Sequence, residues 1–98
     1  MKVAISKRAA RAAERIAAWW AAHADYPAVF PRELLEAIEM LESTRGPGVA
    51  VPTTRHPQLK RVVLVKSRCH IYFELDEARD LVRILEVWDG RRGRRPEL

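Results

Sequence analysis

The chain has a single cysteine, Cys69, among its 98 residues. One thiol excludes an internal disulfide and a zinc site built on several thiolates, and it is typical of proteins from a reducing compartment. No apolar run approaches the roughly 18 residues that a membrane span requires. The first residues also lack the apolar core and cleavage site of a secretory signal. We therefore expect a cytoplasmic protein with no membrane contact.

Glycine and histidine are also scarce. The four glycines match the spacing of neither a phosphate-binding loop nor a nucleophile elbow; they are Gly46, Gly48, Gly90 and Gly93. The three histidines show no paired spacing of the kind that metal sites use; they are His23, His56 and His70. The sequence therefore predicts no bound metal and no cofactor.

Positive charge, in contrast, is plentiful. The formal net charge is +5, from 18 Lys and Arg against 13 Asp and Glu. Residues 1–24 hold five bases and one acid, residues 25–43 hold five acids and one base, and residues 44–98 hold twelve bases and seven acids. A positive field of this kind favours acidic partners, either nucleic acid or an acidic protein segment.

The N-terminal half predicts a strand and two helices. Residues 2–6 alternate as a short strand does, and Ser6 is placed to cap the alanine-rich helix that follows. Two prolines within residues 25–31 end this helix, because proline does not fit a helix interior, and a second helix is expected from about Pro31. The apolar stripe of the first helix comprises Ala9, Ala12, Ala13, Ile16, Ala17 and Trp20, and that of the second comprises Phe30, Leu34, Ala37, Ile38 and Leu41. A basic first helix and an acidic second helix indicate an antiparallel hairpin.

The C-terminal half predicts a small sheet. Residues 45–58 hold two glycines and three prolines, and we expect them to form an irregular connection. Three strand-like runs follow, at 60–67, 69–75 and 81–89. In the first of them Val62–Val65 is apolar at every position, which predicts a central strand covered on both faces.

The order of these elements, β-α-α-β-β-β, indicates an α+β fold. We expect one domain over residues 1–98, in which the helical hairpin packs on a small, mostly antiparallel sheet. Residues 90–98 form a basic C-terminal tail.

The second predicted strand places candidate catalytic residues in a row. His70, Tyr72 and Glu74 share one face, about 7 Å apart, because side chains alternate along a strand. If the strands pair as neighbours, Arg61 and Arg83 flank that row. An acid or a base beside arginines is what cleavage of a phosphodiester needs. A solvated sheet face displays the same residue types by chance, so both interpretations stay open.

Four stretches carry a resemblance to a known family. They are the "VAIS" strand, the helical "AIEMLESTRGPGV", the strand-rich "LKRVVLVKSRCHIYFELDEARDLVRILEVWDGRRG" and the closing "RGRRPEL". Together they span nearly the whole chain, and they resemble the RelE/ParE superfamily of type II toxin–antitoxin toxins. The resemblance implies the fold described above and a role as a toxin.

That superfamily divides by target. RelE-like members are ribosome-dependent ribonucleases that cut mRNA, whereas ParE-like members inhibit DNA gyrase and have no recognised catalytic site. The helical hairpin and "LLEAIEMLES" are more similar to the ParE side. Asp89 stands where many relatives carry a histidine, and Cys69 where many carry an aromatic residue, which weakens the ribonuclease hypothesis. The ribonuclease candidates that remain are His70, Tyr72, Arg61 and Arg68.

The resemblance also implies partners. A cognate ParD-like antitoxin would form a hetero-oligomer with the chain and cover the hairpin and the sheet with a segment that folds on binding. DNA gyrase is the expected target and the ribosome with its mRNA is the alternative; a non-toxic basic binding module is a third possibility. The protein is thus expected to act by binding and not as an enzyme. The residues expected to meet the antitoxin or the target are Arg83, Asp89, Arg91, Arg92, Arg94, Arg95 and Trp19.

Overall fold

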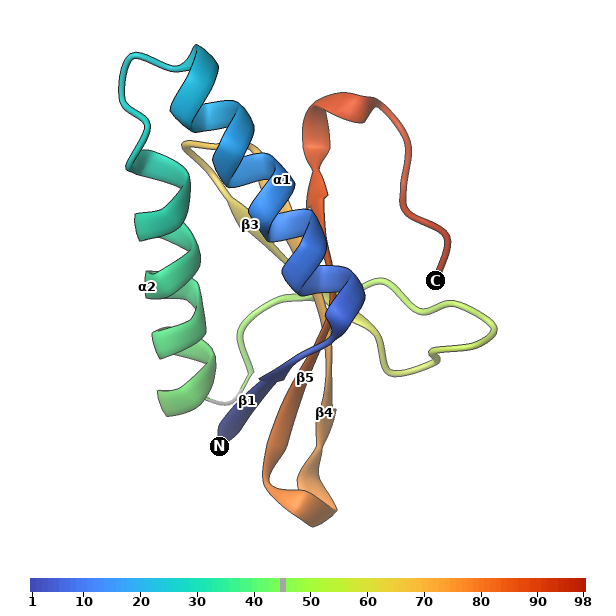
Figure 1. Cartoon of the computed structure of the whole chain (residues 1–98). Helices are drawn as coiled ribbons and strands as arrows, with labels where there is room; N and C mark the ends of the chain where they lie inside the picture. Colours follow the sequence, from blue (N-terminus) through green and yellow to red (C-terminus); the bar gives the residue numbers. More distant parts are fainter. Residues whose placement is uncertain (45) are drawn as a thin grey trace.

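A mixed sheet lies at the centre of the fold (Figure 1) in the computed structural model, which describes residues 1–44 and 46–98. Its strands are β1 (Lys2–Ile5), β2 (Val49–Ala50), β3 (Lys60–Leu64), β4 (Cys69–Asp76) and β5 (Leu81–Asp89). Their order across the sheet is β1-β5-β4-β3-β2. β1 is parallel to β5, and the other neighbouring pairs are antiparallel. The predicted α+β fold is confirmed, and β2 is an addition that the sequence did not predict.

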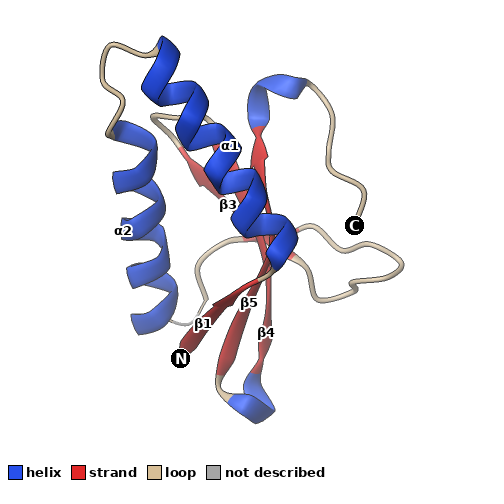
Figure 2. Ribbon diagram, viewed as in Figure 1, coloured by secondary structure: helices blue, strands red, loops and turns tan. Residues whose placement is uncertain are grey.

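Two helices, α1 (Lys7–His23) and α2 (Val29–Ser43), form an antiparallel hairpin beside the sheet (Figure 2). Their apolar stripes pack against one face of β4 and β5, where Ile71, Phe73, Val82 and Ile84 are fully buried or nearly so. The predicted stripes are therefore the ones that form the core. Within residues 1–44 and 46–98, no helix has the length and apolar character that crossing a bilayer demands.

Ser6 joins β1 to α1 as predicted. Its Oγ accepts a hydrogen bond from the Ala9 backbone N–H at 3.0 Å, which caps the first turn of α1. The same hydroxyl donates to the Leu85 carbonyl at 3.0 Å, and the Ser6 N–H donates to the Ile84 carbonyl. The cap therefore also fixes the start of α1 against β5.

The second helix begins earlier than predicted. α2 starts at Val29, so Pro31 lies inside its first turn. Proline is accepted there because the backbone N–H groups of a first turn have no partner within the helix. Pro31 is thus no obstacle to the helix start, and the break between the helices is shorter than predicted.

The prediction that Val62–Val65 is a central strand is wrong. β3 ends at Leu64 and lies next to the sheet edge, where β2 pairs only with Lys60 and Arg61. Val65 is 81% exposed. The central strands are β5 and β4, and the apolar run of β3 reflects a strand that is covered on only one face along part of its length. Of the predicted irregular connection at 45–58, residues 46–58 are irregular apart from β2, and Arg45 lies outside the described residues.

The tail begins with a short 3₁₀ turn, η2 (Gly90–Arg92), and then continues without regular structure to Leu98. Figure 1 shows it leaving the end of β5 and turning back alongside the sheet. A second 3₁₀ turn, η1 (Glu77–Arg79), joins β4 to β5 at the opposite end of these strands.

Candidate functional site

The side chains predicted to share a face of the second strand do so, on the side of the sheet away from the helices. In the strand register, Tyr72 lies opposite Arg61, Glu74 lies opposite Arg83, and His70 lies opposite Trp88. Both arginines therefore flank the row as expected. We call this side of the sheet the tail face, because the C-terminal tail packs on it.

The tail face is covered around Tyr72, so the interpretation of a solvated sheet face is wrong at that residue. Tyr72 is only 2% exposed and packs in a second apolar cluster, apart from the helix-side core. The other members of this cluster are Val51, Leu59 and Trp88, with Leu85 and Leu98 packed against it. Residues 51–59 and the tail bring Val51, Leu59 and Leu98 onto the sheet from two separate parts of the sequence. Pairing of β4 with β5 shifts register between Tyr72 and Phe73, which places Leu85 as an extra residue beside the cluster.

Two polar atoms are buried under this cover without a partner. The Tyr72 hydroxyl and the Arg61 Nε have no hydrogen-bond partner among the described residues. A phenol that donates or accepts a proton during catalysis must reach its substrate. With the tail in place, the Tyr72 hydroxyl has no such access.

His70 lies in a different setting, in a pocket of about 330 Å³ at the η2 end of the strands. Val63, Val65, Arg68 and Arg91 line the pocket with it. Burial and the positive charge of Arg61 lower the pKa of His70 below its usual value. The imidazole is therefore mostly neutral near pH 7, which suits a base or a hydrogen-bonding group better than an acid.

Gly90 makes this arrangement possible. A β-carbon at that position would lie 2.3 Å from the Arg68 carbonyl oxygen and 2.7 Å from the His70 Nε2. The Gly90 N–H donates to the same carbonyl at 2.9 Å. The turn after β5 can therefore close on the β3–β4 turn only because Gly90 has no side chain.

The ribonuclease candidates are only partly brought together. Arg68 and His70 share the pocket, whereas Arg61 and Tyr72 lie under the tail cover. The rings of His70 and Tyr72 are 6.3 Å apart between centroids and tilted, with no hydrogen bond between them. Glu74 pairs with His56, whose Nδ1 lies 3.4 Å from the carboxylate. The row on β4 thus does not form a proton-transfer pair.

Three of the predicted binding residues form one cluster beyond the end of β5. The Asp89 carboxylate accepts hydrogen bonds from the Arg91 backbone N–H at 3.0 Å and from its guanidinium at 2.8 to 3.3 Å. These hydrogen bonds lower the pKa of Asp89. The Arg91 guanidinium also lies over the Trp19 ring, 4.3 Å from its centroid, and Trp19 stacks on His23. Trp19 is 40% exposed, so its ring is only partly covered by these contacts.

The tail is docked on the sheet by Trp88. The indole Nε1 donates to the Arg94 carbonyl at 2.8 Å, and the guanidinium groups of Arg92 and Arg94 lie over the indole at 4.6 and 5.4 Å. Pro96 is buried, and Arg8 on α1 donates to the Glu97 carbonyl. All four tail arginines are exposed, and Arg95 alone of them has no hydrogen bond, ion pair or ring contact in the part of the chain that the structure describes.

Arg83 does not belong to this cluster. It pairs with Asp76 at 2.8 Å, near the η1 end of the strands. Six residues along β5, about 20 Å, separate it from Asp89, the partner of Arg91. A single segment of the antitoxin that contacted both Arg83 and Arg91 would therefore have to extend along most of β5.

Sequence reasoning missed two residues that shape this end of the sheet, Trp88 and Gly90. Trp88 was included in a strand but not in a site, and Gly90 was considered only as a glycine that matches no recognised motif. For Trp88 a signal exists, because a tryptophan two residues from an arginine-rich tail can hold guanidinium groups by cation–π contact. Among the described residues, no group of His, Cys, Asp and Glu is placed to hold a metal ion.

Comparisons with known proteins bear on the fold. No protein-family model matches the sequence, and no curated protein does either. Among solved structures, a chain described as "Chromosomal ParDE TA system from P. aeruginosa" superposes with a TM-score of 0.72 over 91% of this chain and 95% of that one. The two sequences are 14% identical. The chain therefore has the fold of a component of a ParDE toxin–antitoxin system.

Proposed function

We propose that this chain is the toxin of a type II toxin–antitoxin pair, of the ParE-like kind that binds DNA gyrase and blocks replication. The fold shared with a ParDE chain supports the toxin role. The burial of Tyr72 favours gyrase over RNA as the target: its hydroxyl is enclosed by the tail cover and makes no hydrogen bond, so a ribonuclease would lack an accessible phenol.

The surface that meets gyrase consists of the arginines beyond β5. Arg91 is held by Asp89 and Trp19, and Arg92 is held over Trp88, so both guanidinium groups are fixed before any partner arrives. Fixed side chains lose less conformational entropy on binding than free ones. Arg95 adds an exposed positive charge beside them.

The antitoxin binds on the other side of α1, in an apolar groove between the two helices. The groove has a volume of about 330 Å³ and is lined mainly by Ala13, Ala17, Phe30, Leu34, Leu35 and Ile38. Leu35 is 56% exposed at its edge. An amphipathic helix that folds on binding would fill such a groove with its apolar side chains, and acidic residues beyond it would reach the arginines after β5.

The test is induction of the chain alone in a bacterial host, with DNA synthesis and translation followed separately by pulse labelling within minutes. We expect DNA synthesis to fail first, and we expect purified protein to inhibit supercoiling by gyrase. Replacing Arg92 and Arg95 with Gln should relieve growth arrest, whereas Arg79→Gln at the opposite end of the sheet should not. Early arrest of translation with cleaved mRNA would contradict the gyrase target, and harmless expression would contradict the toxin role altogether.

An mRNA endonuclease is the second candidate function, because a neutral imidazole and two arginines share the His70 pocket. Under this alternative His70→Ala removes activity from a folded protein. Tyr72→Phe separates the two hypotheses further: it leaves a gyrase inhibitor fully active and inactivates a ribonuclease that depends on the phenol.

A further inference from the structure

A second pocket lies between α1 and the end of β5, and it includes Arg91 and Arg92 of the surface proposed to meet gyrase. Its volume is about 220 Å³, roughly seven times the volume of a water molecule in the liquid. Its floor is apolar and includes Ala12, Ile16 and Val87. Its walls carry the charged and aromatic side chains Arg15, Arg91, Arg92, Trp19 and Trp88, together with the two acids Glu86 and Asp89. We call it the arginine pocket.

The charges of the arginine pocket do not balance. Both acids are already paired: Glu86 with Arg8 from the start of α1 and with the Val87 N–H, and Asp89 with Arg91. Arg15 and Arg92 have no hydrogen bond or ion pair within residues 1–44 and 46–98. Two positive charges therefore remain for a ligand.

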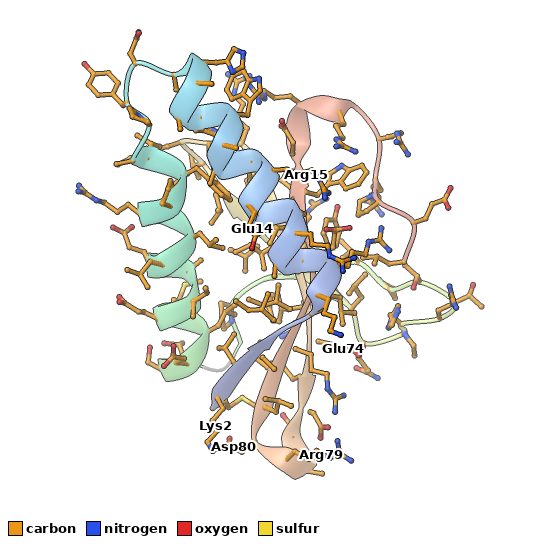
Figure 3. All side chains as sticks on the ribbon, viewed as in Figure 1. Lys2, Glu14, Arg15, Glu74, Arg79 and Asp80 are labelled. Carbon is orange, nitrogen blue, oxygen red and sulfur yellow. The ribbon has the colours of Figure 1, made fainter. Side chains whose placement is uncertain are left out.

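The donors of Arg92 are presented in a fixed position. Its guanidinium lies over the Trp88 indole, 4.6 Å from the centroid. A cation–π contact uses the flat face of a guanidinium and leaves the N–H groups at its edge free for an oxyanion. Arg15 approaches the same pocket from α1, and Figure 3 labels it on that helix. The pocket thus holds one free guanidinium on each of two walls.

We propose that the arginine pocket binds a phosphate monoester, the terminal phosphate of a nucleotide. A phosphate monoester carries about −1.5 to −2 charges near pH 7 and three acceptor oxygens, which matches the two free guanidinium groups that line the pocket. A carboxylate carries one charge and two oxygens, and a single arginine fork satisfies it. The apolar floor and the space beyond one phosphate group accommodate the attached nucleoside.

The same phosphate has two possible sources, a free mononucleotide or the 5′ end of a nucleic-acid strand. Neither source requires the toxin role proposed above, because binding to the purified chain is measured without gyrase, antitoxin or ribosome. Arg92 also belongs to the surface proposed to meet gyrase, so Arg15→Gln is the variant that separates a loss of nucleotide binding from a loss of toxicity.

The experiment titrates the purified full chain by calorimetry with deoxyadenosine 5′-monophosphate, deoxyadenosine, inorganic phosphate, and a short single-stranded DNA with and without a 5′ phosphate. Arg15→Gln and Arg92→Gln are the test variants. Arg79→Gln is the matched control, because it removes the same charge near the η1 end, where Figure 3 labels Arg79. Arg15→Lys keeps the positive charge but loses the planar guanidinium, whose paired N–H groups can donate to two oxygens of one phosphate.

We expect the mononucleotide to bind and deoxyadenosine not to bind. Each Gln variant should weaken binding by about tenfold or more, the usual cost of a charge-assisted hydrogen bond, and Arg79→Gln should bind as the unchanged chain does. Arg15→Lys should recover part of the affinity. Tighter binding of the 5′-phosphorylated strand than of the mononucleotide identifies a strand end as the source, and the reverse identifies the free nucleotide.

Three results would overturn the proposal: no saturable binding of either phosphorylated ligand, equal binding of inorganic phosphate and mononucleotide, or equal losses in the Arg15 and Arg79 variants. Arg15 is exposed on α1, so its variants are expected to fold, and circular dichroism checks this directly. If an acidic peptide binds the pocket and the nucleotide does not, the ligand is a carboxylate and the proposal is wrong.

Discussion

Replacement of Trp88 tests whether the tail is part of the folded domain. Trp88 is 8% exposed and is the side chain that connects the tail to the sheet: it packs with Tyr72, Val51 and Leu59, and its indole donates to the Arg94 carbonyl. We expect Trp88→Ala to destabilise the whole protein and to release the tail, and Trp88→Phe to release the tail at a smaller cost in stability.

The expected magnitudes differ for these two variants. Truncation of a buried tryptophan to alanine costs about 3–5 kcal/mol, which is a large part of the roughly 5–15 kcal/mol that stabilises a typical domain. Phenylalanine still fills most of the site, so Trp88→Phe loses mainly the hydrogen bond to Arg94, worth about 0.5–1.5 kcal/mol. A weaker cation–π contact with Arg92 adds about 0.5 kcal/mol.

Urea unfolding followed by far-ultraviolet circular dichroism measures the free energy of unfolding. With a slope of about 1–3 kcal/mol per molar urea, Trp88→Ala should lower the midpoint by at least about 1 M. Tryptic cleavage after Arg94 should accelerate in both variants, because release of the tail frees the Arg94 carbonyl from the Trp88 indole. A cost below about 1 kcal/mol for Trp88→Ala, with unchanged cleavage of the tail, would refute the docked tail and with it the burial of Tyr72.

Four further predictions concern single residues. Gly90→Ala should lower the free energy of unfolding by about 1–3 kcal/mol, because the new β-carbon meets the Arg68 carbonyl at 2.3 Å and that backbone atom cannot move aside freely; thermal unfolding measures the loss. Ser6→Ala should cost about 1–2 kcal/mol in the same assay, since the cap of α1 and the bond to Leu85 disappear together. Tyr72→Phe should leave stability unchanged or slightly raised, because the hydroxyl that it removes has no partner; a loss above about 1 kcal/mol would contradict this. The lowered pKa of His70 means that the unfolded chain takes up its proton first, so stability should decrease as pH falls below about 6.5, and His70→Gln should reduce that pH dependence.

Much of the fold followed from local patterns. The Ser6 cap, the apolar stripes of both helices and the alternation of β4 each depend on residues a few positions apart, and the structure confirms them. The pairing of Arg61 with Tyr72 and of Glu74 with Arg83 followed from the same alternation once neighbouring strands were assumed.

The cover over the tail face was not predictable in this way. Tyr72 is buried because Leu59, Trp88 and Leu98 meet on it, and these residues lie far from one another in the sequence. A contact between residues that lie far apart in the sequence leaves no periodic pattern from which it could be predicted. Val65 is exposed because β3 ends at Leu64 and Val65 lies in the turn that follows, an end point that its apolar neighbours do not indicate.

The two hypotheses about the target require different positions of the tail. A ribonuclease that used Tyr72 would have to lift residues 93–98 from the tail face, which breaks the hydrogen bond from Trp88 to Arg94 and removes the indole contacts of Arg92 and Arg94. Lifting the tail therefore exposes the phenol and at the same time displaces the arginines that would bind a phosphate or a partner. A protein that acts by binding needs the opposite state, with the tail docked and the guanidinium groups held in place. The contacts around Trp88 stabilise the docked state, in which the Tyr72 hydroxyl is covered and the guanidinium groups are held in place.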